Sequence, residues 1–172
     1  MADSSPDTGA RRLDAPSIKR RMACLPYEGL LLLALLLIAA FPAAGTQGAV
    51  ASGWPQVFFK CYLAAVVACY FSWFWTHGGQ TLPMKTWRIR VVGSKGESIG
   101  ASRALLRLAC ASLFYGPACV ALVLVMFPHR VSPFITVWLA TPALATLLWA
   151  HFDADRQFLH DRLAQTRLVN VS

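Results

Sequence analysis

One carboxylic acid, Glu28, lies inside an apolar stretch of the sequence, between Tyr27 and a run of leucines. A carboxylate in hydrocarbon is unfavourable unless it is paired, protonated or hydrated. Arg21 precedes it by seven residues, which is two helical turns, so both side chains share one face of a helix. The spacing therefore indicates a charged site within a predicted membrane helix.

Two interpretations of Glu28 remain open from the residues alone. It is either a proton or cation site inside a bundle of helices, or a member of a structural ion pair near the membrane interface. In the second case, Arg20 or Arg21 reaches along the helix to Glu28 or to an acid on another element.

A second group of charged side chains follows the last apolar stretch: Asp153, Asp155, Arg156, His160, Asp161 and Arg162. A metal site would draw its ligands from His151, Asp153, Asp155 and His160. Their spacing is not typical of metal ligands, so a solvated cluster of salt bridges is favoured over a metal site. We predict no bound metal and no cofactor.

Motifs of soluble enzymes do not occur in the sequence. Gly78 and Gly79 are not followed by the Lys-Ser/Thr of a phosphate-binding loop, and no nucleophile elbow or zinc-protease motif is present. The five cysteines form no Cys-x-x-Cys pair, which favours packing roles over disulfides or metal binding. We therefore predict that the protein is not an enzyme.

The elements that must position these side chains are membrane helices. Hydrophobic residues make up 56% of the 172 residues, and charged residues only 14%, clustered outside the apolar stretches. We predict an all-α integral membrane protein in which residues 1–19 form a disordered tail and residues 20–172 form one membrane domain. Its four transmembrane helices are predicted at residues 22–44, 54–75, 104–127 and 131–150.

Two alternatives concern the ends of this series. The first stretch follows basic residues, as a signal peptide does, but it is longer than the usual signal core of about 7–15 residues. The fourth stretch is barely long enough to span, so the last two stretches could instead form a re-entrant hairpin.

The distribution of basic residues predicts the orientation. All of the 16 lysines and arginines except Lys60 and Arg130 fall in the N-terminal segment, the central loop with the adjoining helix start, or the C-terminal segment. Cytoplasmic segments carry such an excess, so both termini are predicted to be cytoplasmic. The net charge of +8 then points to anionic lipid rather than nucleic acid as the partner.

Two segments on this side alternate between polar and apolar residues. Residues 86–92 do so in the central loop, and residues 167–171 have a strand-like composition near the C-terminus. We expect them to join in a small cytoplasmic sheet.

Three stretches resemble the RDD family of small bacterial membrane proteins, which is named for an Arg and two Asp. Residues 20–28 resemble its opening, in which an acid follows Arg after seven residues. Residues 75–92 resemble its Gly-Gln-Thr-Leu-Gly-Lys segment, and residues 159–167 its closing His-Asp-Arg-Leu-Ala-Gly-Thr. The family's named residues fall on Arg21, Glu28 and Asp161, supported by Arg20, Gln80, Thr81, Lys85, His160 and Arg162.

Departures from the family pattern affect the first acid and two turns. Glu28 stands where the family has Asp, which keeps the charge and lengthens the arm, while Pro83 and Gln165 each replace a Gly.

The resemblance implies a multi-pass protein of the bacterial inner membrane, related to transport by exchange of a monovalent cation for protons. Glu28 would bind a proton or a cation, and Arg21 would stabilise the ionised form of Glu28. Asp161 would organise the cytoplasmic opening of the ion path. Four helices are few for a transporter, so a homo-oligomer is expected. The alternative is a non-transporting membrane scaffold or assembly factor that binds lipid or a partner protein.

Overall fold

The computed structural model describes residues 15–46, 52–125, 132–153 and 157–171. Most of the predicted disordered tail, residues 1–14, lies outside this part of the chain. Ile18 already begins helix α1 (Ile18–Ala40), whose N-cap is Ser17; the Ser17 hydroxyl accepts a hydrogen bond from the Arg20 amide at 3.4 Å.

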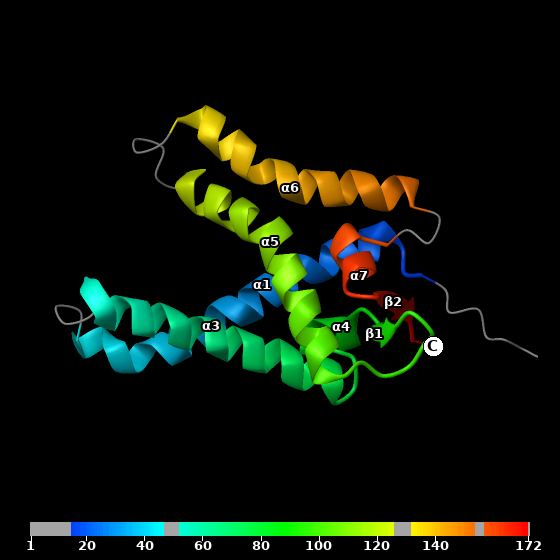
Figure 1. Cartoon of the computed structure of the whole chain (residues 1–172), viewed down its shortest axis with the longest axis horizontal. Helices are drawn as coiled ribbons and strands as arrows, with labels where there is room; N and C mark the ends of the chain where they lie inside the picture. The colour runs from blue at the N-terminus through cyan, green and yellow to red at the C-terminus, as the bar shows by residue number, and fades with distance from the viewer. Residues whose placement is uncertain (1–14, 47–51, 126–131, 154–156, 172) are drawn as a thin grey trace, which may run out of the picture.

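Within the described residues, four helices are long and apolar enough to cross a membrane, as predicted. The first is α1, which continues into the short 3-10 helix η1 (Phe41–Thr46). The others are α3 (Gly53–Thr76), α5 (Ala101–Val125) and α6 (Pro133–Phe152). Helices α5 and α6 contain 25 and 20 residues, so their lengths favour two spans over a re-entrant hairpin. The axis of α5 changes direction along its length, and Pro117 lies inside it (Figure 1).

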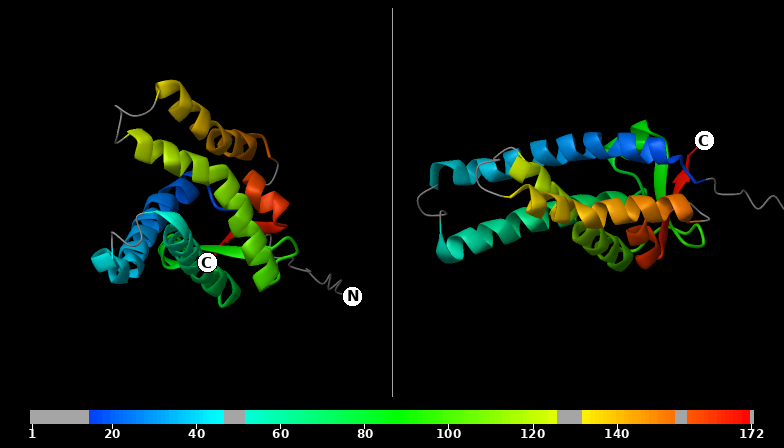
Figure 2. Two further views of the ribbon diagram at one scale, coloured as in Figure 1. Left: turned by 60° about the vertical axis from the view of Figure 1, so that its left-hand side comes forward. Right: turned by 90° about the horizontal axis from the view of Figure 1, so that it is seen from above.

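Successive long helices run in opposite directions (Figures 1 and 2). The starts of α1 and α5 and the ends of α3 and α6 therefore lie at the same end of the molecule. Four short elements lie there as well: α4 (Leu82–Thr86), β1 (Ile89–Gly93), α7 (Leu159–Leu163) and β2 (Thr166–Asn170). We call this end, with these four elements, the sheet end.

The two strands pair antiparallel, with Val91 opposite Leu168, which confirms the predicted joining of the two strand-like segments. The first strand begins later than predicted, because Thr86 ends helix α4 instead of opening the strand. The Thr81 side chain caps this helix, accepting from the Met84 amide at 3.4 Å, and Pro83 lies in its first turn. Both features favour a helix start over an extended chain.

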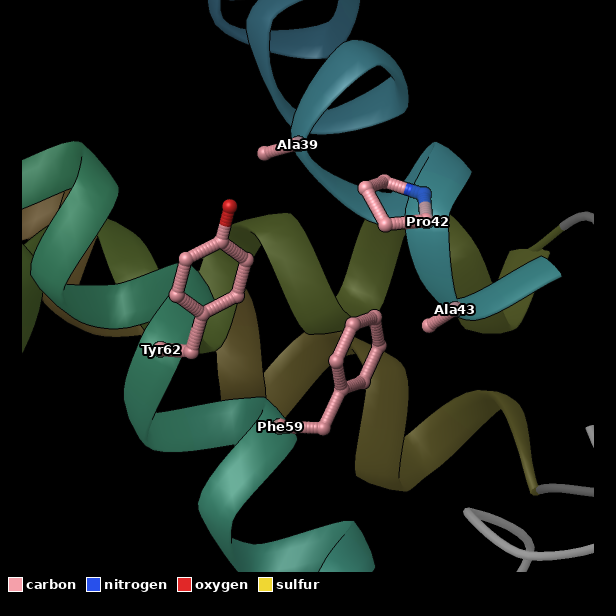
Figure 3. Close-up of a pocket in the computed structure, with 5 residues that line it drawn as sticks. All are labelled: Ala39, Pro42, Ala43, Phe59 and Tyr62. Carbon is pink, nitrogen blue, oxygen red and sulfur yellow. The ribbon is translucent and has the colours of Figure 1, made fainter. Parts of the chain in front are cut away.

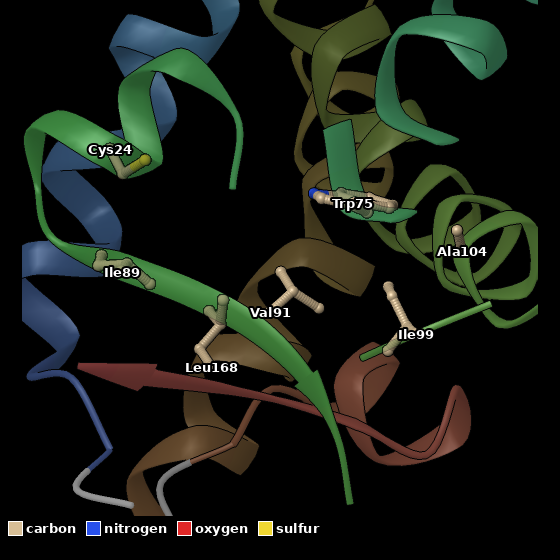
Figure 4. Packing of buried hydrophobic residues seen from close by; sticks show 7 residues of the cluster. All are labelled: Cys24, Trp75, Ile89, Val91, Ile99, Ala104 and Leu168. Atoms are coloured by element: carbon tan, nitrogen blue, oxygen red, sulfur yellow. The ribbon is translucent and has the colours of Figure 1, made fainter. Parts of the chain in front are cut away.

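A buried apolar cluster joins the sheet to the ends of the long helices. Its members are Cys24, Trp75, Ile89, Val91, Ile99, Ala104 and Leu168. Figure 4 shows Val91 and Ile99 on the side of the strands that faces Trp75. Farther from the sheet end, large apolar side chains are exposed, for example Leu37 at 63% and Leu122 at 66%. The long helices thus present an apolar surface suited to lipid, and the tightest packing lies at the sheet end.

Four of the described residues at the sheet end adopt the left-handed backbone region: Gly79, Arg88, Gly96 and Gln165. Gln165, which replaces a Gly of the family pattern, has a φ of 51°, so this chain adopts the glycine-type conformation with a side chain present. Gly79 has a φ of 71°, and a Cβ added there would lie 2.5 Å from the Val91 carbonyl oxygen. Gly78, its neighbour, has no atom within 4 Å of an added Cβ.

These two glycines give a matched pair of variants. Gly79→Ala places a side chain in the left-handed region and against the β1 backbone, so it should lower the free energy of unfolding by at least about 1–2 kcal/mol. Gly78→Ala should leave it within about 0.5 kcal/mol. Thermal unfolding in detergent, followed by circular dichroism, measures both. Equal melting temperatures for the two variants would contradict the predicted close contact.

Candidate functional site

Four of the predicted site residues, Glu28, Thr81, His160 and Asp161, lie in two polar clusters together with residues that were not predicted. The Glu28 cluster comprises Glu28, Tyr70 and Thr81. The Arg107 cluster comprises Arg107, His160, Asp161 and Thr166. Each member is buried or half-buried. Glu28, Tyr70 and Arg107 lie on helices that are apolar enough to cross a membrane.

In the Glu28 cluster, two hydroxyl groups donate to the two carboxylate oxygens. The Tyr70 hydroxyl on α3 donates to Oε1 at 2.9 Å, and the Thr81 hydroxyl before α4 donates to Oε2 at 2.6 Å. Glu28 is 8% exposed and Thr81 is fully buried. The cluster therefore ties α1 to α3 and to the turn that follows α3.

Gln80 and Lys85 flank Thr81 in the segment that resembles the family. The Gln80 side chain donates from Nε2 to the Ile89 carbonyl at 2.8 Å, so it anchors the start of β1. Lys85 is exposed on α4 and does not reach Glu28 through a described contact. Thr81 alone of these three supporting residues bonds directly to the carboxylate.

Arg21 lies on the same face of α1 as Glu28 but belongs with the other cluster. Its guanidinium lies over the Phe158 ring at 5.4 Å and interacts electrostatically with Asp161. Side chains on a helix lean toward its N-terminus, so Arg21 leans away from Glu28, which follows it by two turns. The hydrogen bonds described on Glu28 come from hydroxyls, whereas the acid described as interacting with Arg21 is Asp161, which lies on another element.

The Arg107 cluster is built around a buried ion pair. Arg107 on α5 donates from one terminal nitrogen to the Asp161 carboxylate on α7 and to the Thr166 hydroxyl on β2, the latter at 2.8 Å. His160 Nε2 lies 3.2 Å from the same carboxylate oxygen. The guanidinium also lies over the Trp75 ring at 5.0 Å. One arginine thus connects three elements that are distant in sequence.

The electrostatics of this cluster keep Asp161 ionised. Burial by itself would raise the pKa of this carboxyl, but the Arg107 charge, with smaller contributions from His160 and Arg21, outweighs it. The pKa is lowered to about 2. The carboxylate therefore carries its charge at neutral pH although it is fully buried.

The C-terminal charged residues form ion pairs, as the favoured interpretation expected, but not all of them are solvated. Asp153 pairs with Arg162 at 2.7 Å, and its other oxygen accepts from the Gln157 amide at 2.9 Å. Asp161 and His160 are buried instead, because α7 packs beneath α5. Arg20 remains at the surface, 3.5 Å from the Asn170 side chain. Asp155 and Arg156 lie outside the described residues.

Sequence reasoning missed Arg107 and Tyr70 as members of the site. The sequence did contain a signal for Arg107, since a cation inside a predicted membrane span indicates a functional or buried charge. It was instead counted among the basic residues that flank the membrane on the cytoplasmic side. Tyr70 had none, because it lies in a stretch rich in aromatic residues and its partner is 42 residues away.

A separate cavity lies at the opposite end of the long helices. Its volume is about 280 Å³, and its lining residues come from α1, η1 and α3: Ala39, Pro42, Ala43, Phe59 and Tyr62 (Figure 3). The lining contains no carboxylate and no cation. It shares no residue with either cluster, so it offers no site for an ion.

The lowered pKa of Asp161 predicts an acid-dependent loss of stability. An unfolded Asp has a pKa of about 3.9, so the folded carboxylate contributes its full stability above that pH and loses it as the pH falls through about 2. We expect Asp161→Asn to flatten the dependence of stability on pH between about 5 and 2. At pH 7 it should lower the free energy of unfolding by about 3–5 kcal/mol, because Arg107 loses its buried partner.

Unfolding in detergent at a series of pH values measures this dependence. Glu97→Gln is the control. A backbone hydrogen bond and Arg103 also lower the pKa of Glu97, but Glu97 is exposed and solvent screens its ion pair, so this variant should change the pH dependence much less than Asp161→Asn. A wild-type pH dependence that survives intact in Asp161→Asn would refute the assignment.

Comparison with known proteins identifies the family of the chain. The model of the RDD family matches residues 15–165 of the 172-residue chain. No curated protein and no solved structure matches the chain. The matched range includes Arg21, Glu28, Arg107 and Asp161, and it contains the four helices that are long and apolar enough to cross a membrane. The chain therefore belongs to the RDD family, and it is a membrane protein with several apolar helices.

Proposed function

We propose that this protein exchanges a monovalent cation for protons across a membrane, with Glu28 as the carboxylate that binds either one. The observation that carries the proposal is the setting of Glu28. Its side chain is 8% exposed on an apolar helix, and hydroxyl groups contact both of its oxygens. A buried acid with neutral oxygen partners is equipped to bind a small cation.

The chemistry of the cluster supports exchange rather than permanent charge. A carboxylate and two hydroxyls offer oxygen ligands, which suit hard cations. The hydroxyls of Tyr70 and Thr81 donate to the bare carboxylate, and on rotation each can present a lone pair to a bound cation instead. The carboxylate can hold one proton or one monovalent cation, so one replaces the other without a change in net charge.

The Arg107 cluster supports a different role on the side of the sheet end. Its hydrogen bonds hold α5 against α7 and β2 at the sheet end. We assign Asp161 and Arg107 to the organisation of the mouth through which ions reach Glu28. Arg21, which interacts with Asp161, belongs to the same mouth.

Location and orientation form part of the proposal. Exposed cations gather at the sheet end, among them Lys19, Lys85 and Lys95, whereas Lys60 lies toward the other end. The charge bias supports a cytoplasmic sheet end and cytoplasmic termini, in a bacterial inner membrane. Exposed apolar side chains cover the long helices, and four helices enclose little space, so a homo-oligomer is proposed.

A second candidate is a non-transporting scaffold or assembly factor. The observation that favours it is the Arg107–Asp161 pair. This buried ion pair links α5, α7 and β2, and such a link stabilises the fold whether or not the protein transports ions. On this view, Glu28 holds α1 to α3, and the surface of the sheet end binds lipid or a partner protein.

Cation-driven proton flux in proteoliposomes tests the first candidate. We expect the wild type to acidify or alkalise the lumen when a sodium or potassium gradient is imposed. Glu28→Gln should lower the rate at least tenfold, because it removes the exchangeable charge but keeps the size of the side chain and its ability to form hydrogen bonds. Tyr70→Phe should lower it several-fold. The matched control is Glu97→Gln, which removes an exposed acid at the sheet end and should leave the rate unchanged.

The outcomes separate the candidates. A correctly inserted wild type without flux under any gradient removes transport and leaves the scaffold. Flux that survives in Glu28→Gln removes Glu28 as the exchanging carboxylate, while transport itself stands.

A further inference from the structure

One face of the sheet end combines unpaired cations with exposed apolar side chains. We call it the α4 surface and define it by Tyr27 on α1, Leu82 and Lys85 on α4, and Trp87 and Arg88 in the turn that follows. Helix α4 packs beside α1 (Figure 2). Its Pro83 is buried and its Met84 packs on the apolar cluster, so Leu82 and Lys85 point outward.

The cations of this surface have no acid to neutralise them within the described part of the chain. The four carboxylates described there are engaged elsewhere. Glu28 binds two hydroxyls, whereas Glu97 pairs with Arg103, Asp153 with Arg162, and Asp161 with Arg107 and His160. Lys85 and Arg88 are exposed and form no ion pair with any described residue. As far as the described residues go, the positive charge of this surface is therefore not compensated.

Apolar and aromatic groups lie directly beside these charges. Tyr27 is 56% exposed and Leu82 is 50% exposed. The rings of Tyr27 and Trp87 meet edge to face, with centroids 6.1 Å apart, so α1 and the turn after α4 form one continuous surface. Tyrosine and tryptophan side chains with neighbouring Lys and Arg are typical of the membrane interface, where rings lie among the headgroups and cations reach the phosphates.

We propose that the α4 surface is a binding site for an anionic phospholipid. The phosphate of the lipid lies against Lys85 and Arg88, and its acyl chains lie along Leu82 and Tyr27. A free phosphate would satisfy the two cations but would leave the exposed apolar side chains in water. An anionic lipid satisfies both parts of the surface at once, and α1, which carries Tyr27, is itself one of the helices able to cross a membrane.

The site is independent of the proposed ion exchange, since it shares no residue with the Glu28 or Arg107 clusters. It lies close to the Glu28 cluster, because Thr81 caps α4 and also donates to Glu28. A bound lipid would hold α4 against α1 at the point where Thr81 meets the carboxylate.

Lipid binding by the full chain can be measured directly by native mass spectrometry in a neutral detergent. The probes are phosphatidylglycerol and phosphatidylcholine of the same chain length, each titrated separately. We expect the wild type to bind phosphatidylglycerol more tightly than phosphatidylcholine. Lys85→Gln/Arg88→Gln should weaken phosphatidylglycerol binding about twentyfold, because each cation near an anionic lipid surface contributes about fivefold.

Two further variants make the result specific. Lys60→Gln/Lys95→Gln removes the same number of charges from exposed positions outside the α4 surface and should weaken binding less than about fivefold. Lys85→Arg/Arg88→Lys keeps both charges and should retain wild-type binding. Melting temperatures in neutral detergent show that all variants are folded, since none of these side chains is buried.

Three results would overturn the proposal. The wild type could bind both lipids equally, and an acidic protein segment would then be the better candidate to bind Lys85 and Arg88. The Lys60/Lys95 control could lose as much affinity as the Lys85/Arg88 variant, which would reduce the effect to overall charge. Inorganic phosphate at the concentration of the lipid could displace phosphatidylglycerol, which would make this a site for a free anion.

Discussion

The buried ion pair between Arg107 and Asp161 is the contact on which the arrangement of the sheet end depends. Neither charge has water around it, so each needs the other, and removing either would leave an uncompensated charge in the interior. The same guanidinium also binds Thr166 and covers Trp75. A long helix, a one-turn helix, a strand and the end of α3 are therefore fixed relative to one another through one side chain.

The two buried clusters solve the same problem in different ways. Asp161 keeps its charge through cations, which lower its pKa to about 2. Glu28 has hydroxyl groups as hydrogen-bond partners. A hydroxyl can donate to an ionised carboxylate or accept from a protonated one, so these partners suit both forms of Glu28. This difference in partners is the reason why the proposed exchange is assigned to Glu28 and not to Asp161.

Much of the fold could be predicted because its signals are local. An apolar run of about 20 residues must be a helix in lipid, since no water satisfies its backbone, and alternation over a few residues indicated the strands. The site was predicted less completely. Glu28 and Asp161 stood out by type and position, but the partners Tyr70 and Thr81 lie 42 and 53 residues from Glu28. Arg107 lies 54 residues from Asp161, and the charge pattern offered a simpler explanation for it.

The sequence alone determined that the chain has four long apolar helices, a small sheet, and most of its cations in three segments. The helices follow from the thickness and the low polarity of the bilayer interior, which only an apolar segment of about 20 residues can span. Only the tertiary structure decided which groups contact Glu28 and Asp161, and it brought Arg21 close enough to Asp161 to interact with it electrostatically. A charge in a low-dielectric interior is satisfied by whichever polar group packing brings within a few ångströms, and packing depends on the whole chain.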